Sequence, residues 1–528
     1  MYPSHDLWDR DEGDPSWPPH SPPIETLSPQ LLEDVKKSPT TSPEEAAAFR
    51  YLWDPEVYQA CTLDRIKKWP RSDVTPKVAN LLMAHHLARH TDNPKSIGYI
   101  FLKPEPRKKR FRIIHDTLGP NVRCAKPPNP NFATVRIVTD GVYAGYYAAT
   151  VDWKCFFYQI ALHPDVQDFF TFEVNGIHYA FNRLPMGFTW SVVITIAITR
   201  YLASGLPGAT FVDTYVDNTL IVGLTKADVL RALNELLRRA KTYNVTVGEV
   251  THGHTVTHRG MELDFLNKTV RATSSAVTKL LDRNARNVGT WGHWRSLISS
   301  VFNIMAIYGT PLGTFPHLAK YLSKHALTDP RTPVSPWDQF LHEWDSAIDM
   351  IRRNTPVHPR RPSLAGPIVI TDARLDTQAT VLAAILITTN GDVETATWHL
   401  DPKGHEINQL EAMAFDKAID RWPHHFNDAV VTHLIDNTAA MCAIHHGHTP
   451  AFRLNVVATR TATKQQRLNF DIISLYVPSL HNPADALTRD CEFSAEHRAV
   501  LDWAVRNALQ ASKWVERARG VFLFNGLP

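Results

Sequence analysis

Acidic residues beside predicted strands are the groups in this chain best suited to chemistry. Asp152 follows an apolar, β-branched run, and Asp217 lies within residues 211–222, where two β-branched runs flank the pair Asp217-Asn218. Asp and Asn favour tight turns, so this segment predicts a β-hairpin with the Asp217 carboxylate at its tip. Carboxylates are the natural ligands of hard divalent cations, and the two acids therefore predict a site for Mg²⁺ or Mn²⁺.

Phosphoryl transfer is the chemistry that such a site would serve. Two cations about 4 Å apart neutralise charge on the attacking and leaving oxygens. A single strand Asp is more often solvated or structural than catalytic, so the neighbouring segments decide between these interpretations. The run Leu184-Pro-Met186-Gly187-Phe lies between the two acids in the sequence, and its glycine would let the backbone approach a nucleotide.

In this order the segments resemble the palm of a reverse transcriptase. Residues 151–160 resemble the first palm motif of retroelement polymerases, in which an aromatic residue five positions after the acid blocks the ribose 2′-hydroxyl. Phe157 stands at that position, so the resemblance implies deoxynucleotide substrates; the same aromatic run would alternatively belong to the core. Met186 and Gly187 match the loop-to-helix segment that packs on the incoming base.

The basic segment 108–121 resembles the fingers of the same family, where a basic loop and a strand arginine grip the triphosphate. Arg112 fits that arginine because its guanidinium offers a fixed bidentate fork, and Lys109 is a looser candidate beside Lys108. A solvated basic loop or a nuclear localisation run would have the same composition. Residues 258–264 resemble the hairpin that holds the primer end.

Two positions depart from the family pattern. Asn218 stands where the family has a second Asp, and an amide keeps an oxygen but loses a full charge, so cation binding should weaken without being abolished. The family often has a lysine near residues 246–250 that donates a proton to pyrophosphate; this chain has none there, and His252 and His254 are the nearby substitutes. Polymerase activity is therefore expected to depend largely on Asn218.

Four further acids lie at predicted strand ends or on predicted helices: Asp372, Glu411, Asp436 and Asp485. Their order, and the closing run Asn-Pro-Ala-Asp-Ala-Leu-Thr-Arg at 482–489, resemble the metal-binding carboxylates of retroelement RNases H. The resemblance implies two ions that activate a water and stabilise the leaving oxygen of an RNA strand, with His481 as a further candidate for water activation. Alternatively these are surface acids, and Asp485 simply favours a helix dipole. One predicted helix carries four basic residues that would contact phosphates or be solvated: Arg453, Arg460, Lys464 and Arg467.

Composition bounds the class of protein and its compartment. The chain has 528 residues, 44% of them apolar, and a net charge of +3, which does not by itself indicate nucleic-acid binding. Five scattered cysteines without a Cys-x-x-Cys pair indicate a reducing compartment, with neither a zinc site nor disulfides. A signal peptide is not expected, and the apolar runs are too short to cross a bilayer. We therefore expect a soluble intracellular protein of the cytoplasm or nucleus, with no membrane partner.

The expected fold is α+β: a right-hand polymerase with fingers, palm and thumb, followed by a helical connection and an α/β RNase H-like domain. Pro-rich breaks separate these regions, and the acidic, Pro-rich N-terminus lacks the apolar residues that would offset its ordering entropy. The predicted parts are a disordered tail at 1–45, fingers and palm at 46–275, thumb and connection at 276–360, an RNase H-like domain at 361–500 and a C-terminal helix or tail at 501–528.

The predicted function is that of a retroelement reverse transcriptase with RNase H, and the tyrosine-recombinase type (DIRS, Ngaro and VIPER) has the most similar motifs. The resemblance implies two Mg²⁺ or Mn²⁺ ions in each site and RNA template, DNA primer, dNTPs and RNA–DNA hybrid as partners; it sets no oligomeric state. One alternative is a degenerate or domesticated relative that binds hybrids, with polymerase lost at Asn218 and the RNase H acids intact. Another is an RNA-dependent RNA polymerase, against which Phe157 and the RNase H-like segment argue.

Overall fold

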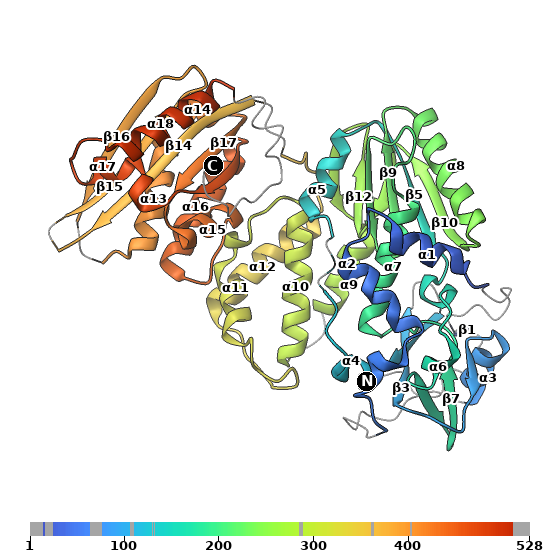
Figure 1. Ribbon diagram of the computed structural model, residues 1–528. Helices are drawn as coiled ribbons and strands as arrows, with labels where there is room; N and C mark the ends of the chain where they lie inside the picture. Colours follow the sequence, from blue (N-terminus) through green and yellow to red (C-terminus); the bar gives the residue numbers. More distant parts are fainter. Residues whose placement is uncertain are drawn as a thin grey trace. The chain divides into compact units, whose positions relative to one another are not determined.

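The structure, a computed structural model, divides into two compact units, residues 1–268 and 269–528. Both units combine helices with β-sheets (Figure 1), which confirms the predicted α+β class. The described residues are 14–15, 25–63, 76–105, 110–128, 130, 132–284, 289–360, 364–377, 379–401 and 404–510. Within these ranges, no helix combines the length and the apolar character that crossing a membrane requires.

The N-terminal part of the first unit contains helices where a disordered tail to residue 45 was expected. The Ser28 hydroxyl accepts a hydrogen bond from the backbone N–H of Gln30 and caps the first helix. Leu31 and Val35 of that helix are fully buried, and burial of this i, i+4 stripe offsets the entropy that the composition alone left uncompensated. Apart from residues 14–15, the tail before residue 25 lies outside the described residues. The helices are α1 (Pro29–Lys37), α2 (Pro43–Ala48), η2 (Phe49–Leu52), η3 (Pro55–Tyr58) and α3 (Pro76–Ala84).

A six-stranded sheet lies in the first unit, with the strand order β1-β4-β3-β6-β7-β2. Strands β3 and β4 form an antiparallel hairpin, and β3 also pairs in parallel with β6. The tip of this hairpin, residues 106–109, lies outside the described residues. The strands are β1 (Asp14–Pro15), β2 (Ala88–His90), β3 (Ile97–Glu105), β4 (Arg110–Asp116), β6 (Thr171–Val174) and β7 (Ile177–Phe181), and the connecting helices are α4 (Leu118–Arg123), α5 (Val135–Asp140), η5 (Gly141–Tyr143) and α6 (Pro164–Gln167).

A four-stranded antiparallel sheet, ordered β10-β5-β9-β8, carries the first pair of acids. Helix α8 packs against β5 and β9 through buried residues that include Leu233 and Leu236. A separate hairpin follows this sheet in the chain. The elements are β5 (Tyr147–Trp153), η6 (Phe156–Gln159), α7 (Thr189–Leu202), β8 (Phe211–Tyr215), β9 (Asn218–Gly223), α8 (Lys226–Thr242), β10 (Val247–Gly253), β11 (Thr255–His258) and β12 (Met261–Asp264).

After the short strand β13, the second unit continues with helices, in agreement with the helical connection predicted within 276–360. Their core is aromatic: the Trp294 ring lies 5.2 Å from Phe340 and 5.3 Å from Trp344, each in edge-to-face geometry. The elements are β13 (Thr269–Ala272), α9 (Ser274–Asn284), α10 (Trp291–Ile307), η7 (Leu312–Thr314), α11 (Pro316–Lys324) and α12 (Asp338–Arg353).

A five-stranded sheet, ordered β16-β15-β14-β17-β18, completes the second unit. Strands β15 and β16 are antiparallel to their neighbours, whereas β17 and β18 continue the sheet in parallel from β14. Alternating residues of the central strands face two cores, one shared with α13, α15 and α16 and the other with α17 and α18 (Figure 1). The elements are β14 (Leu364–Leu375), β15 (Thr380–Ile387), β16 (Val393–Leu400), α13 (Ile407–Arg421), α14 (Pro423–Phe426), β17 (Ala429–Ile435), α15 (Thr438–His446), α16 (Phe452–Arg467), β18 (Asp471–Tyr476), η8 (Ser479–His481), α17 (Pro483–Thr488) and α18 (Ala495–Ala508).

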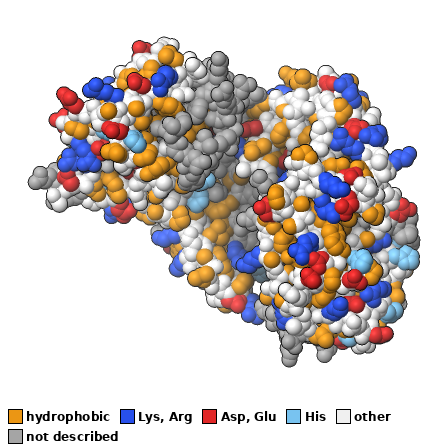
Figure 2. All heavy atoms as spheres, in the orientation of Figure 1, with side chains coloured by type: hydrophobic (Ala, Val, Ile, Leu, Met, Phe, Trp, Pro, Cys, Tyr) orange, Lys and Arg blue, Asp and Glu red, His pale blue; other side chains and the backbone are white. Residues whose placement is uncertain are grey.

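The charged surface is mixed. On the face drawn in Figure 2, Lys and Arg side chains are interspersed with Asp and Glu side chains over the described surface. This distribution agrees with the small net charge of +3. The candidate sites must therefore be located from side-chain geometry rather than from a field of one sign.

Candidate active sites

The hairpin that carries Asp217 turns one residue earlier than the sequence predicted. Tyr215 pairs with Asn218, so the two turn residues are Val216 and Asp217, and Asn218 begins β9 instead of completing the turn. Asn218 is also the strand partner of Asp152 on β5, and pairing on both sides of β9 fixes this register. Val216 adopts a left-handed φ of 55°, an uncommon conformation for a β-branched residue.

Asp152 and Asp217 are brought together by this pairing. The backbone N–H of Trp153 donates to the Asp217 carbonyl oxygen at 3.0 Å, which ties the turn to the end of β5. The Asn218 side-chain N–H donates to Asp217 Oδ1, also at 3.0 Å. This site therefore offers two carboxylates, and an N–H donor occupies the position of the family's second acid.

A bulge in β10 lies directly opposite Asp152, a feature that the motif comparison missed. The pairing with β5 shifts between Val247 and Val250, and an added Cβ on Gly248 would lie 2.9 Å from the Asp152 carbonyl oxygen and 3.2 Å from its Oδ2. A methyl group at Gly248 would thus force Asp152 to move. A glycine inside a strand pattern is the sequence signal that could have indicated this close approach.

A second overlooked residue, Gln159, holds the segment that follows Asp152. Its fully buried amide donates to the carbonyl oxygens of Lys154 at 2.6 Å and Thr246 at 2.9 Å, and accepts from Thr246 N–H at 2.8 Å. The side chain thereby links the end of β5 to the start of β10. Because buried amides need such partners, Gln159 helps to fix the backbone around Asp152.

The two histidines considered as proton donors lie away from Asp152. His252 pairs with Ala149, three residues from Asp152 along β5, which corresponds to about 10 Å. The Tyr147 hydroxyl lies 2.9 Å from His252 Nδ1, and His254 Nδ1 lies 2.7 Å from the Tyr146 carbonyl oxygen. This geometry therefore does not support either histidine as the proton donor that replaces the family's lysine.

The predicted nucleotide-binding loop is tied to the six-stranded sheet. Gly187 has a φ of 127°, and a Cβ there would collide with the His115 carbonyl oxygen, while the Met186 carbonyl accepts from His115 N–H at 3.0 Å. Asn121, to which the motifs assign no role, donates to the Gly187 carbonyl at 2.8 Å and accepts from Thr189 N–H at 2.9 Å. Met186 is half-buried and Gly187 is exposed, so the loop edge remains accessible.

The aromatic run after Asp152 divides between core and edge. Phe156 and Tyr158 are buried, as the core interpretation predicted, whereas Phe157 is half-buried. Of the two triphosphate candidates, Arg112 lies on β4 opposite Lys103, and its side chain lies outside the described residues. Lys109 lies entirely outside them.

The hairpin compared with a primer-holding element is anchored to β8. His258 Nε2 lies 2.7 Å from Asp213 Oδ2, and both side chains are almost completely buried. The turn residues Arg259 and Gly260 both have positive φ, and the Arg259 guanidinium lies 4.6 Å from the ring centroid of Tyr215. These contacts join the hairpin to the strand that leads into the Asp217 turn.

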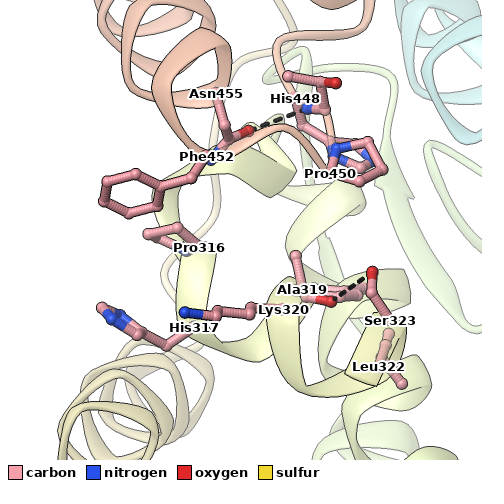
Figure 3. A pocket seen from close by; sticks show the side chains of 12 residues that line it. Pro316, His317, Ala319, Lys320, Leu322, Ser323, His448, Pro450, Phe452 and Asn455 are labelled. Atoms are coloured by element: carbon pink, nitrogen blue, oxygen red, sulfur yellow. Dashed lines mark hydrogen bonds between the residues drawn. The ribbon is translucent and has the colours of Figure 1, made fainter. Parts of the chain in front are cut away.

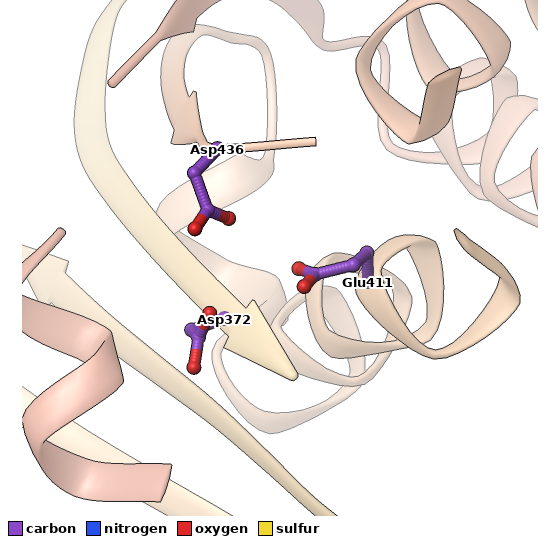
Figure 4. A group of neighbouring side chains, drawn as sticks. All are labelled: Asp372, Glu411 and Asp436. Atoms are coloured by element: carbon purple, nitrogen blue, oxygen red, sulfur yellow. The ribbon is translucent and has the colours of Figure 1, made fainter. Parts of the chain in front are cut away.

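The second acid group converges from three different elements. Asp372 lies on β14, Glu411 on α13, and Asp436 directly after β17, and one oxygen from each lies within 4.8 Å of the others (Figure 4). Asp372 and Glu411 are each 4% exposed. Glu411 Oε2 and Asp436 Oδ1 are buried without a hydrogen-bond partner. Unpartnered carboxylate oxygens at this spacing fit the ligand set of a divalent cation.

Burial and mutual repulsion dominate the electrostatics of this group. Burial, with smaller contributions from Asp436 and Asp485, raises the pKa of Asp372 to about 6 against the opposing hydrogen bond from Thr488. Burial first, and the neighbouring Asp372 second, raise the pKa of Glu411 to about 10. The ionised group is therefore costly without positive charge nearby, which is the condition that a bound cation relieves.

Asp485 lies close to these three acids but outside the group that they form. It lies on α17, and its Oδ1 accepts a hydrogen bond from Arg489 Nε at 2.7 Å. His481 ends η8, immediately before this helix. Of the four acids predicted from the sequence, the structure thus brings three together and pairs the fourth with arginine.

The basic residues of α16 mainly pair with acids. Arg460 and Lys464 lie 2.5 and 2.9 Å from the two carboxylate oxygens of Asp416, which is almost fully buried. Lys464 also contacts Asp420 at 2.7 Å. These ion pairs join α16 to α13, so the two residues have structural partners and the phosphate-contact interpretation loses support for them.

A separate cavity of about 300 Å³ lies between α11 and the start of α16 (Figure 3). Its wall includes Pro316 and Lys320 on one side and Phe452 and Asn455 on the other. The wall includes none of the acids described above. The cavity is therefore distinct from both acid sites.

Comparison with known proteins bears on the first unit. Residues 107–249 match the family described as reverse transcriptase (RNA-dependent DNA polymerase). The chain contains a reverse transcriptase domain. The domain holds eight of the predicted site residues: Lys109, Arg112, Asp152, Phe157, Met186, Gly187, Asp217 and Asn218. The matched residues end before the second acid group.

The chain has a similar curated relative in a transposon. The Retrovirus-related Pol polyprotein from transposon 412 of Drosophila melanogaster is 26% identical over 176 residues, which cover 30% of this chain and 13% of the polyprotein. The chain thus corresponds to a small part of that relative's length. Two solved structures are similar to this chain, each at 14% identity and a TM-score of 0.47. The first is a foamy viral protease–reverse transcriptase dRH in complex with double-stranded DNA, and the match covers 87% of this chain and 84% of that one. The second is a foamy viral protease–reverse transcriptase in complex with an RNA/DNA hybrid, and the match covers 86% of this chain and 64% of that one.

Proposed function

We propose that this protein is a retroelement polymerase that synthesises DNA on RNA or DNA templates and degrades RNA in RNA–DNA hybrids. The observation that carries the proposal is that Asp152, at the end of β5, lies beside the turn that holds Asp217, because Asn218 pairs with Asp152 and the Trp153 N–H donates to the Asp217 carbonyl oxygen. The expected partners are RNA template, DNA primer, dNTPs and hybrid. Placement in the tyrosine-recombinase type remains a prediction from the motifs.

In the first site, Asp152 and Asp217 would hold the cations, and Asn218 would contribute at most an amide oxygen after giving up its hydrogen bond to Asp217. Bound divalent cations would neutralise charge on the attacking and leaving oxygens in both sites. Phe157 would exclude a ribose 2′-hydroxyl, and Met186 and Gly187 would pack on the incoming base. Arg112 and Lys109 would contact the triphosphate.

In the second site, Asp372, Glu411 and Asp436 would form the main cation-binding group, with Asp485 as the fourth acid. The unpartnered oxygens of Glu411 and Asp436 support this assignment, because buried carboxylates without donors are unfavourable unless a cation satisfies them. Asp372 and Asp436 lie toward the C-terminal ends of the parallel pair β14 and β17, with Glu411 of α13 beside them, and a hybrid strand would reach the group there.

A specific observation supports a second candidate function, a hybrid-binding ribonuclease whose polymerase is inactive. The Asn218 side-chain N–H donates a hydrogen bond to the Asp217 carboxylate, and the turn carries one negative charge fewer than it would with a second Asp. Cation binding in the first site then depends on two carboxylates alone.

One experiment tests both candidates. Primer extension on an RNA template with dNTPs is measured for the full chain in Mg²⁺ and then in Mn²⁺, alongside cleavage of a labelled RNA–DNA hybrid. Extension that Asp217→Ala removes, with cleavage retained, supports the polymerase proposal. Absence of extension in both metals, with cleavage that Asp372→Asn removes, supports the ribonuclease alone, and absence of both activities contradicts both candidates.

A further inference from the structure

The helix α17 is fixed to strand β14 at both of its ends. The Asn482 amide donates to the Thr371 carbonyl oxygen at 2.9 Å, and its side-chain oxygen caps the helix by accepting from Ala484 N–H at 3.1 Å. At the other end, the Thr488 hydroxyl donates to Asp372 Oδ2 at 2.6 Å. Both anchoring side chains are buried, so the backbone of α17 has a defined position relative to Asp372.

Asp485 lies between these two anchors, yet its carboxylate does not belong to the converging group of Asp372, Glu411 and Asp436. Its partner is Arg489, one helical turn further on, with Nε 2.7 Å from Asp485 Oδ1. Because the helix backbone is fixed, rotation of the Asp485 side chain decides whether the fourth carboxylate faces the group. The ion pair with Arg489 opposes that rotation.

The surroundings favour this arrangement electrostatically. Arg489 brings the only positive charge that contacts Asp485 in the described hydrogen bonds and ion pairs, and it compensates the carboxylate of Asp485 beside the other three acids. The Arg489 side chain is 59% exposed, so it can leave Asp485 without breaking a packed core. A cation that uses Asp485 must first exchange with this guanidinium.

We propose that Arg489 is a positioning residue that holds Asp485 away from the three-acid group and thereby limits how tightly the site takes a second divalent cation. The inference rests on the proposed ribonuclease function, because it assumes that the four acids form one cation site. Thr488 and Asn482 keep the helix in place while the Asp485 side chain changes partner.

Titration of Mn²⁺ into the full chain, without nucleic acid, tests the inference through the electron paramagnetic resonance signal of free Mn²⁺. The Asp372→Asn variant identifies which part of the binding belongs to this site. In the Arg489→Gln variant, we expect the more weakly bound of the two Mn²⁺ ions at this site to bind roughly tenfold more tightly than in the unmodified chain. The reason is that the substitution removes a positive charge near the ion. Arg489→Lys keeps the charge but loses the planar fork, so a smaller gain is expected.

The matched control is Arg331→Gln, which removes an exposed Arg–Asp pair with Asp329 in the same unit. Its Mn²⁺ affinity should equal that of the unmodified chain. Unchanged or weaker binding in Arg489→Gln, with binding sensitive to Asp372→Asn still present, would overturn the role of Arg489 alone. If no binding depends on Asp372, both this inference and the proposed ribonuclease site are contradicted. Combining Arg489→Gln with Asp485→Asn should cancel the gain.

Discussion

The two acid sites differ in how much negative charge they hold and in how it is compensated. In the first unit, Asp152 lies on β5 and Asp217 in the turn before the neighbouring strand β9, and Asn218 donates a hydrogen bond to Asp217. In the second unit, three acids converge from a strand, a helix and a strand end, and two of their buried oxygens have no hydrogen-bond partner. The first site therefore has few carboxyl groups and is internally hydrogen-bonded, whereas the second has more carboxyl groups, whose buried oxygens are unsatisfied without a cation.

This difference teaches that a neutral residue can change a site's electrostatics and leave its backbone intact. Asn218 pairs with Asp152 and Tyr215 through its backbone, so the pairing that presents Asp217 beside Asp152 does not use the side chain of residue 218. What changes is the charge that attracts a cation. The two sites should therefore respond differently to metal identity and to added charge.

The largest expected effect separates the two sites completely. Asp217→Ala should lower primer extension on the order of 10³-fold and leave hybrid cleavage unchanged, whereas Asp372→Asn should do the reverse, because each variant removes a carboxylate from only one site. Asp485→Asn should behave as Asp372→Asn does. Steady-state rates of both reactions measure this, and loss of both activities in either variant would contradict the assignment of two independent sites.

Gly248→Ala probes the close approach to Asp152. The added methyl group must displace backbone or carboxylate of Asp152, and displacements near 1 Å can cost about 10²-fold in rate. We expect a loss of that order in single-turnover extension, without an effect on hybrid cleavage. The control is Gly289→Ala, where an added Cβ meets open space; an equal loss in both variants would show that Gly248 has no special role.

Asn218→Asp tests whether charge is what distinguishes the first site. The unmodified chain should extend primers faster in Mn²⁺ than in Mg²⁺, because its weakened site favours the cation that binds more readily to few ligands. The added carboxylate should raise extension in Mg²⁺ by roughly tenfold and reduce this preference. Equal rates in the two metals for the unmodified chain, or no gain in the variant, would mean that the site is adapted to Asn.

The smallest expected effect concerns the pH dependence of stability, in which the two units should behave alike. Burial lowers the pKa of His115 in the first unit to about 3, and burial likewise lowers the pKa of His433 in the second unit to about 3, from 6.5. The unfolded chain takes up these protons near pH 6.5 and the folded chain does not, so the contribution to stability is full above pH 6.5 and is lost as the pH falls toward 3.

Each buried histidine should lower the free energy of unfolding by about 1.4 kcal/mol for every unit by which the pH falls within this window. His115→Gln and His433→Gln should each flatten the pH dependence of urea unfolding between pH 7 and 5.5 by about 1 kcal/mol, in the unit that carries the variant. A pH dependence that neither substitution changes would show that other groups control acid stability.

Motifs predicted the candidate residues better than they predicted the local geometry around them. The motifs singled out Asp372, Glu411 and Asp436, which the structure brings together, and the predicted helical connection within 276–360 agrees with the structure. The sequence pattern placed the turn at Asp217-Asn218 and missed Gly248, Gln159 and Asn121. It also assigned residues 25–45 to a disordered tail, although Leu31 and Val35 are buried there.

The reason lies in the range of the interactions. Residue type, spacing along one strand or helix and the chemistry of carboxylates are local properties, and the sequence by itself determined that this chain carries a reverse transcriptase motif with Asn218 in place of an acid and a second acid set after it. Strand register, the bulge opposite Asp152, the burial that raises the pKa of Glu411 and the pairing of Asp485 with Arg489 depend on contacts between distant segments or on side-chain orientation. Only the tertiary structure decided these, because several registers and rotamers satisfy the same local pattern and packing selects among them.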